Sequence, residues 1–239
     1  MCYKYATPKL KDLLQYLEEM PAYTVKDYHE YYIADGFVHN LMPITTSEES
    51  HTIQGAIWGL VPEWIRDSQQ AKDWADKTLN AKSETVFELA SFKNYIGKNR
   101  CLIWASGFYE WQWRDAKGKN KIPHFIYMPN HKPYTMGGVY TKWQRPDTGA
   151  TLLTFSIITT PANSLLSEIH NNKKRMPLII QPEDRDISLS DLKRDEIETL
   201  MKPLPDGILQ AHTISKLITT RGAETNVPEV QDEFKYELF

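Results

Sequence analysis

The residue with the most distinctive chemistry is Cys2, which directly follows the initiator Met1. If Met1 is removed and Cys2 is exposed, the chain begins with an α-amine and a thiol on adjacent carbons. The amine condenses with an aldehyde to an imine, and the thiol then closes a thiazolidine ring with the advantage of an intramolecular reaction. Ordinary pKa values of about 8 and about 8.5 leave both groups partly reactive near neutral pH. A cysteine at position 2 can also be incidental, so the other residues of the chain must show whether Cys2 has a chemical role.

A second candidate for chemistry is Glu110, which stands between Tyr109 and Trp111 in the apolar stretch 100–113. We expect this stretch to form one central strand. A carboxylate among aromatic residues costs free energy unless it faces a polar site. Such surroundings raise the pKa of a carboxyl group, which suits a general acid. The alternative is a glutamate that faces outward at an edge of the sheet.

The third candidate, His170, precedes a run of three basic residues, Lys173, Lys174 and Arg175. A short helix is expected to begin near residue 161 and to end next to His170, and a strand is expected at 178–181. A histidine at a helix end beside three bases is well placed to meet a phosphate-bearing ligand. A solvated basic loop is the alternative.

The elements that must position these residues are mostly strands. An amphipathic helix is predicted over 8–20, where leucines recur at helical spacing, and we expect it to hold the N-terminus on the body. Further strands are predicted at 52–60, 123–128, 134–140 and 152–159. The fold class is therefore α+β, a single domain over 1–239 with a barrel-like, mostly antiparallel core and peripheral helices. Residues 1–181 form its main body with the site, and 182–239 form an acidic helical and tail section packed on it.

The composition excludes several classes of protein. The 239 residues are 41% hydrophobic and 25% charged, as is usual for a globular domain. No run of about 18 apolar residues and no signal peptide is found, so we expect a cytoplasmic protein. Two cysteines make no disulfide framework. Without any common nucleotide, phosphate-loop or zinc motif, we expect no cofactor and no metal. Nothing in the sequence demands a dimer, and we expect a monomer.

The distribution of charge and of tryptophan is compatible with a face for single-stranded nucleic acid. Residues 181–239 carry a net charge of −6, and the remainder carries +3. Six of the seven tryptophans lie between Trp58 and Trp113. Basic and aromatic residues together bind single strands by stacking and charge. Gly59 and Pro62 predict a loop that carries Trp64, which either faces solvent or a ligand or folds onto the core.

Six motifs in order resemble the SOS response-associated peptidase (SRAP) family, whose members process abasic sites in DNA. They are Met1-Cys2, Asn40 with Pro43, Trp58-Gly59-Leu60-Val61-Pro62, Asn80-Ala81-Lys82-Ser83-Glu84-Thr85, Gly107-Phe108-Tyr109-Glu110-Trp111, and His170 with Arg175-Met176-Pro177. The resemblance spans roughly residues 1–181. It implies an enzyme that senses abasic sites in single-stranded DNA and links Cys2 to the ring-opened sugar as a thiazolidine, which shields the lesion.

The resemblance also implies roles for individual residues. Asn40 would orient the Cys2 terminus, Glu110 would act as general acid and base in opening the sugar, and His170 would assist proton transfer at the imine. The residues implied to bind DNA are Trp64, Asn80, Lys82, Lys173, Lys174 and Arg175. Lys82 stands where the family commonly has arginine, so the charge is kept but the bidentate fork is lost.

Two other functions remain open from the sequence. One is a thiol peptidase with Cys2 as nucleophile and His170 as base. We confine any proteolysis to removal of the residue before Cys2, so the expected enzyme chemistry is lyase-like. The other is a non-covalent single-strand binder, which would bind intact and abasic strands alike.

Overall fold

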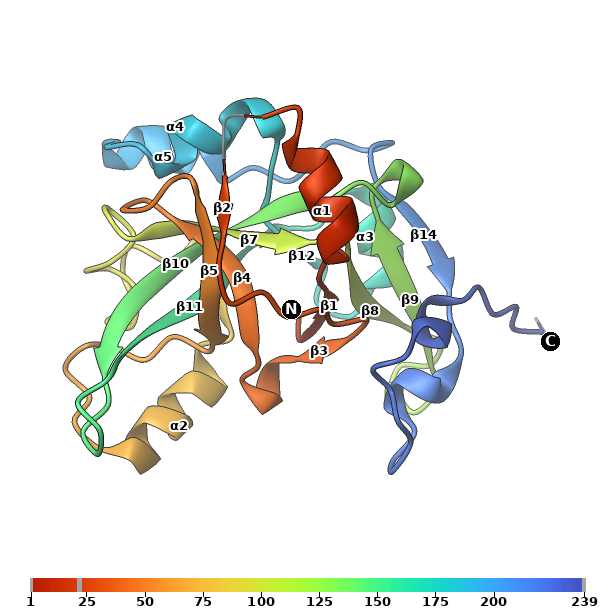
Figure 1. The fold of residues 1–239 in the computed structure, drawn as a ribbon. Helices are drawn as coiled ribbons and strands as arrows, with labels where there is room; N and C mark the ends of the chain where they lie inside the picture. Colours follow the sequence, from red (N-terminus) through yellow and green to blue (C-terminus); the bar gives the residue numbers. More distant parts are fainter. Residues whose placement is uncertain (1, 21–22, 238–239) are drawn as a thin grey trace.

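A closed five-stranded barrel forms the centre of the computed structural model, which describes residues 2–20 and 23–237 (Figure 1). Its strands in spatial order are β11 (Thr151–Pro161), β10 (Tyr134–Gln144), β7 (Arg100–Ala105), β4 (Leu41–Thr46) and β5 (Thr52–Trp58). Neighbours pair antiparallel, except that β5 and β11 pair in parallel and close the ring. Four short strands extend this sheet: β2 (Thr24–Val25), β6 (Asn80–Lys82), β12 (Arg175–Pro177) and β13 (Ile179–Ile180). The predicted barrel-like, mostly antiparallel α+β fold is confirmed.

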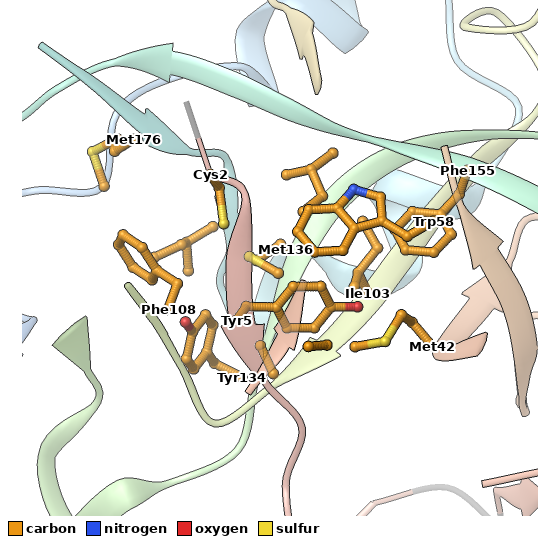
Figure 2. Close-up of a cluster of buried hydrophobic side chains, with 14 of the residues drawn as sticks. Cys2, Tyr5, Met42, Trp58, Ile103, Phe108, Tyr134, Met136, Phe155 and Met176 are labelled. Carbon is orange, nitrogen blue, oxygen red and sulfur yellow. The ribbon is translucent and has the colours of Figure 1, made fainter. Parts of the chain in front are cut away.

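The barrel closes around an apolar interior that follows the two-residue period of its strands. Met42 and Ile44 of β4 and Phe155 and Ile157 of β11 belong to one buried cluster. Figure 2 shows Met42 and Phe155 in this cluster. Alternate residues of a strand point to one face, so these side chains meet inside the ring. On β7, Cys101 and Ile103 belong to this interior cluster, whereas Leu102 between them belongs to a second buried cluster outside the ring. Both faces of β7 are therefore covered, which explains its continuous apolar run.

A second, five-stranded sheet carries the N-terminus. Its order is β14 (Gln210–Thr213), β9 (Lys121–Tyr127), β8 (Gly107–Trp113), β1 (Lys4–Ala6) and β3 (Ala34–Asp35), with every neighbouring pair antiparallel. Strand β1 pairs with β8 through Tyr5 opposite Phe108 and Ala6 opposite Gly107. Continuing this register beyond the end of β1 places Tyr3 opposite Glu110. The acidic C-terminal section contributes β14 as an edge strand of this sheet.

The single strand predicted over 100–113 is wrong, because the structure divides it into β7 and β8 in two different sheets. The break lies at Ser106, whose backbone N–H donates to Ala6 O at 2.9 Å and whose hydroxyl donates to Thr7 O at 3.0 Å. These bonds turn the chain toward the N-terminal segment. A local pattern of apolar residues could not reveal the break, since the partners are about a hundred residues away.

Helices lie around the two sheets. They are α1 (Leu10–Leu17), α2 (Ser68–Lys77), α3 (Ser164–Ile169), α4 (Arg185–Leu189) and α5 (Arg194–Leu200). The 3₁₀ turns are η1 (Gly36–Val38), η2 (Pro129–His131), η3 (Pro182–Asp184), η4 (Lys216–Thr219) and η5 (Pro228–Gln231). The predicted amphipathic helix corresponds to α1, which buries Leu13 and Leu17 in a cluster with Ile53 and Trp104. None of the helices in the described part of the chain has the length and apolar character that crossing a membrane requires.

We predict that Gly107→Ala lowers the free energy of unfolding by about 1–3 kcal/mol, as over-packing does in a dense interior. A Cβ at this position would lie 2.3 Å from the ring of Phe125 and 2.9 Å from Ile126 O. The Phe125 side chain is 1% exposed and cannot swing into solvent. Urea unfolding measures the change. Gly97→Ala is the control, since its Cβ would meet no atom within 4 Å; equal stability of the two variants would contradict the prediction.

Candidate active site

The N-terminal segment is fixed by backbone and side-chain hydrogen bonds. The amide Nδ2 of Asn80 donates to Cys2 O at 2.8 Å, and Gly36 N donates to Tyr3 O at 2.9 Å. Asn80 begins β6, which pairs in parallel with β11, so the barrel itself positions this amide. The contact with the Cys2 backbone thus comes from Asn80, for which the sequence predicted DNA binding. The predicted role of Asn40 in orienting this terminus stays a prediction.

The thiol of Cys2 is buried, contrary to the exposed aminothiol expected from the sequence. Cys2 is 0% exposed and belongs to the same cluster as Phe108 and Met136 (Figure 2). Burial, followed by the negative charge of Glu110, raises the pKa of this thiol. The thiol is therefore protonated at neutral pH. The predicted removal of Met1 concerns a residue outside those that the structure describes.

Glu110 is a buried carboxyl group in the interior of the second sheet. Its strand β8 lies between β1 and β9, which excludes the outward-facing edge position considered from the sequence. Only 4% of the residue is exposed, and burial raises its pKa to about 7. At neutral pH a large fraction of this group carries a proton. It meets the requirement for a general acid whose pKa lies close to the working pH.

The ring of His170 lies beside this carboxyl group. His170 ends α3, is 7% exposed, and has its Nδ1 2.9 Å from Arg175 O and 3.7 Å from Glu110 Oε1. Because a backbone carbonyl only accepts, Nδ1 carries the hydrogen and the lone pair of the neutral ring is on Nε2. Burial lowers the pKa of His170 to about 4. The two groups form a protonatable acid next to a neutral imidazole.

Asn171 joins the histidine loop to the strand of the glutamate. Its Oδ1 accepts from Trp113 N at 3.0 Å, and its Nδ2 donates to Trp113 O at 2.9 Å. The side-chain amide thus replaces a strand partner at the end of β8. Within the loop, Lys174 N donates to His170 O at 2.8 Å and closes the turn. These bonds bring Glu110 and His170 together although 60 positions separate them in the sequence.

A pocket of about 280 Å³ opens onto Glu110 and His170. Its lining residues are Tyr3, Glu110, Trp111, Trp113, Lys121, His170, Asn172, Lys173 and Thr219. Lys121 Nζ lies 4.8 Å from the centre of the Trp113 ring. The aromatic wall and Lys121 were not among the predicted site residues, although the clustering of tryptophans next to Glu110 was a signal for them. Thr219 shows that the C-terminal section also reaches this pocket.

Three of the predicted DNA-binding residues gather around the end of β11. Asn80 lies opposite Ile157 on one side of this strand, and Arg175 lies opposite Pro161 on the other. Lys82, two residues after Asn80, is exposed, as are the predicted contacts Lys173 and Lys174.

Arg175, in contrast, is engaged within the protein. Its guanidinium makes a bidentate ion pair with Glu84 and donates to Thr159 O at 2.5 Å. The hydrogen bonds from Arg175 lower the pKa of the Glu84 carboxyl group. Arg175 therefore ties β12 to the end of β11, and binding a phosphate would require it to exchange partners.

Of the predicted site residues, only Glu110, His170 and Lys173 line the pocket described above, and Trp64 and Asn40 belong to other parts of the fold. The Trp64 side chain is 51% exposed and packs edge-on against Trp74, with ring centres 5.1 Å apart. It lines a different hollow, together with Arg66 and Asn94. Trp64 therefore faces solvent, which was one of the two alternatives for its loop. Asn40 precedes β4, and its backbone O accepts from Trp58 N at 3.2 Å.

Within residues 2–20 and 23–237, no group of three or more His, Cys, Asp or Glu side chains is arranged to bind a metal ion. The arrangement around the pocket supplies an acid, a base and basic and aromatic walls. These groups can transfer protons and bind an anionic, partly aromatic ligand.

Comparison with known proteins gives concordant matches. The family model "SOS response associated peptidase (SRAP)" matches residues 1–221. Abasic site processing protein YoqW of Bacillus subtilis (strain 168) is 31% identical over 193 residues, which cover 80% of this chain and 81% of YoqW. Abasic site processing protein HMCES of Pongo abelii is 31% identical over 199 residues, covering 72% of this chain and 54% of that longer protein. A crystal structure of a protein from Bacteroides thetaiotaomicron has 32% identity and a TM-score of 0.86, and covers 98% of this chain and 100% of that one.

We predict that Glu110→Gln removes a pH-dependent loss of stability. Between pH 4.5, the ordinary pKa, and about 7, the folded protein keeps the Glu110 proton while the unfolded chain loses it. Stability of the wild type therefore falls as the pH rises through this window, and the variant lacks that decline. Relative to the wild type, the variant should gain on the order of 3 kcal/mol between the two pH values.

Urea unfolding at both ends of the window measures this gain. Glu88→Gln is the matched control, because the Glu88 side chain is exposed and makes no hydrogen bond or ion pair in the described part of the chain. A variant-to-wild-type difference that is constant with pH would contradict the burial argument.

Proposed function

The chain belongs to the SOS response associated peptidase (SRAP) family, and we propose that it processes abasic sites in single-stranded DNA by forming a covalent link through Cys2. The observation that carries the proposal is the meeting of three elements at one place. The Cys2–Tyr3 segment, the carboxyl group of Glu110 and the ring of His170 come together through β1–β8 pairing and the Asn171 bonds. Relatives named abasic site processing proteins support the substrate.

The proposed chemistry uses the α-amine of Cys2 after Met1 has been removed. An abasic deoxyribose is a cyclic hemiacetal. As the ring opens, the ring oxygen gains a proton and the hydroxyl on the same carbon loses one, which gives the aldehyde. The amine adds to this aldehyde and water is lost, which gives the imine. The thiol then adds to the imine carbon, its proton passes to nitrogen, and the thiazolidine ring is closed. Every atom of amine, thiol and sugar is retained except the oxygen and two hydrogens lost as water.

Glu110 is the proposed general acid for opening the sugar. Its raised pKa of about 7 keeps a protonated fraction available at neutral pH, where an ordinary glutamate would be ionised. The carboxylate left after proton donation is the base that accepts a proton when the amine attacks. The neutral ring of His170, with its Nε2 lone pair, assists proton transfer at the imine. The thiol must become accessible for the last step, since it is buried in the structure described.

The DNA is proposed to lie across the mouth of the pocket. The basic side chains Lys82, Lys121, Lys173 and Lys174 would contact phosphates, which makes binding salt-dependent. Trp111 and Trp113 in the pocket wall offer faces on which bases can stack. Trp64 and Arg66, which line a separate hollow, would contact a strand only outside the lesion pocket.

The thiol-peptidase alternative has less support from the geometry. A peptidase requires a thiolate that an adjacent base generates. Burial raises the pKa of the Cys2 thiol, and burial lowers the pKa of His170, so neither group favours the thiolate–imidazolium pair. A non-covalent binder would use the same pocket walls without needing Cys2. Covalent capture requires both the abasic site and the Cys2 thiol, whereas non-covalent binding requires neither, so this requirement distinguishes the two functions.

We predict that Cys2→Ser and Cys2→Ala each abolish a heat-stable adduct between the Met-free protein and an abasic-site oligonucleotide. Serine keeps the amine but cannot close the sulfur-containing ring. A denaturing gel measures the adduct. Cys101→Ala is the matched control, because Cys101 is likewise a free, buried cysteine and the variant should keep the wild-type yield. Undiminished adduct with Cys2→Ala would refute the proposal, and adduct on intact strands would refute the requirement for the lesion.

The rate of adduct formation should depend on Glu110 and on pH. We predict that Glu110→Gln slows single-turnover adduct formation on the order of 100-fold near pH 6, the usual scale of general acid–base catalysis. The wild-type advantage over the variant should shrink as the pH rises past about 7, where the acid loses its proton. Time courses at several pH values measure both effects. An advantage that is unchanged from acidic to alkaline pH would exclude Glu110 as the general acid.

A further inference from the structure

A second pocket, of about 330 Å³, lies beside helix α1 and is lined by two basic residues. One is Lys132, which follows η2, and the other is Arg185, which begins α4. Neither residue lines the pocket of Glu110 and His170. The proposed function leaves this pocket without a role.

Arg185 is a buried cation for which the described residues supply no anion. The residue is 1% exposed, its Nε donates to Thr135 Oγ1 at 3.1 Å, and its Nη1 lies 3.5 Å from the sulfur of Met20. Its guanidinium carbon lies 5.3 Å from the centre of the Tyr16 ring and 4.9 Å from that of Trp104. These contacts use two of five N–H donors, one of them on a weak sulfur acceptor. A buried charge of this kind is costly unless an anion pairs with it.

The surroundings of Arg185 add positive charge and no negative charge inside the pocket. The exposed side chain of Lys132 has its Nζ 5.2 Å from the centre of the same Tyr16 ring. Among the residues that the structure describes, no acidic side chain lines the pocket. The nearby acids of the sequence are Glu183, Asp184 and Asp186, and none of them makes an ion pair with Arg185 or Lys132. The anion is therefore missing from the described protein.

The remaining walls are mainly apolar. The lining includes Pro129, Pro133, Pro182 and Ile180, with the amides Asn130 and Gln181 among its uncharged polar side chains. The volume is within the range of small-molecule sites, in which apolar walls surround a few polar groups. A free phosphate would leave the apolar part of this lining without a partner. A planar carboxylate matches the fork of a guanidinium and leaves a hydrocarbon part for the walls.

We propose that this pocket binds a small carboxylic acid with an apolar body, whose carboxylate pairs with Arg185 and Lys132. The pairing supplies the anion that the buried guanidinium lacks, and the prolines enclose the hydrocarbon part. Since the two pockets share no lining residue, this proposal stands independently of DNA processing. Its failure would leave the adduct chemistry untouched.

Titration of the full chain with 3-phenylpropionate, followed by nuclear magnetic resonance and calorimetry, tests the proposal. We expect saturable binding with a Kd below about 1 mM and shifted signals of Tyr16 and Thr135. The neutral probe 3-phenylpropan-1-ol should bind at least about tenfold more weakly, because it cannot pair with the guanidinium. Inorganic phosphate should also bind more weakly, because it has no apolar part.

Two variants assign the binding to this pocket. Lys132→Gln, at an exposed position, should weaken 3-phenylpropionate binding about fivefold, as loss of a partly exposed charge pair does. Lys11→Gln is its control, since Lys11 is an exposed residue of the neighbouring helix α1 that does not line the pocket. Arg185→Lys should weaken binding further while thermal unfolding verifies that the variant folds. No saturable binding, equal binding of the alcohol, or tighter binding of phosphate would each overturn the proposal.

Discussion

The pairing of β1 with β8 is the interaction on which the candidate site depends. It pairs Tyr5 and Ala6 with Phe108 and Gly107 of the strand that carries Glu110, so the segment that follows Cys2 is held by sheet hydrogen bonds. Chain termini are usually poorly ordered unless an element of this kind restrains them. The second restraint, from Asn80 to Cys2 O, comes from a strand attached to the barrel. Together the two sheets hold one short segment from both sides.

Burial acts in opposite directions on the two titratable groups of the site. It raises the pKa of Glu110 to about 7 and lowers that of His170 to about 4, because the charged form of each group loses hydration. Near neutral pH, Glu110 is therefore partly protonated, and the imidazole of His170 beside it is uncharged. A buried carboxylate–imidazolium pair would require the desolvation of two charges. The protein thus retains an acid and a base without forming that pair.

Two of the predicted site residues are held in contacts within the protein. The Cys2 thiol is packed in the barrel cluster, and Arg175 is paired with Glu84. Lys82, Lys173 and Lys174 are exposed in the described protein, whereas Arg175 binds a phosphate only by giving up its carboxylate partner. In the proposed function, the exposed lysines would supply the long-range attraction for DNA, and the internal contacts of Cys2 and Arg175 would limit access to the pocket.

The sequence by itself determined the fold class, the helix at α1 and the residues whose side chains could take part in chemistry. Amphipathic spacing depends on neighbours three or four positions apart, and a glutamate among aromatic residues stands out in any linear reading. The motifs around Cys2, Glu110 and His170 also indicated the family, which the comparisons confirm.

Only the tertiary structure decided which of these residues meet. The break at Ser106, the parallel closure of β5 on β11 and the bond from Asn80 to Cys2 each join segments about 80 to 100 positions apart. Such contacts depend on strand register and barrel closure, and short sequence patterns do not encode either. Burial of the Cys2 thiol has the same origin, because a residue near the start of the chain is buried only when the two sheets enclose it.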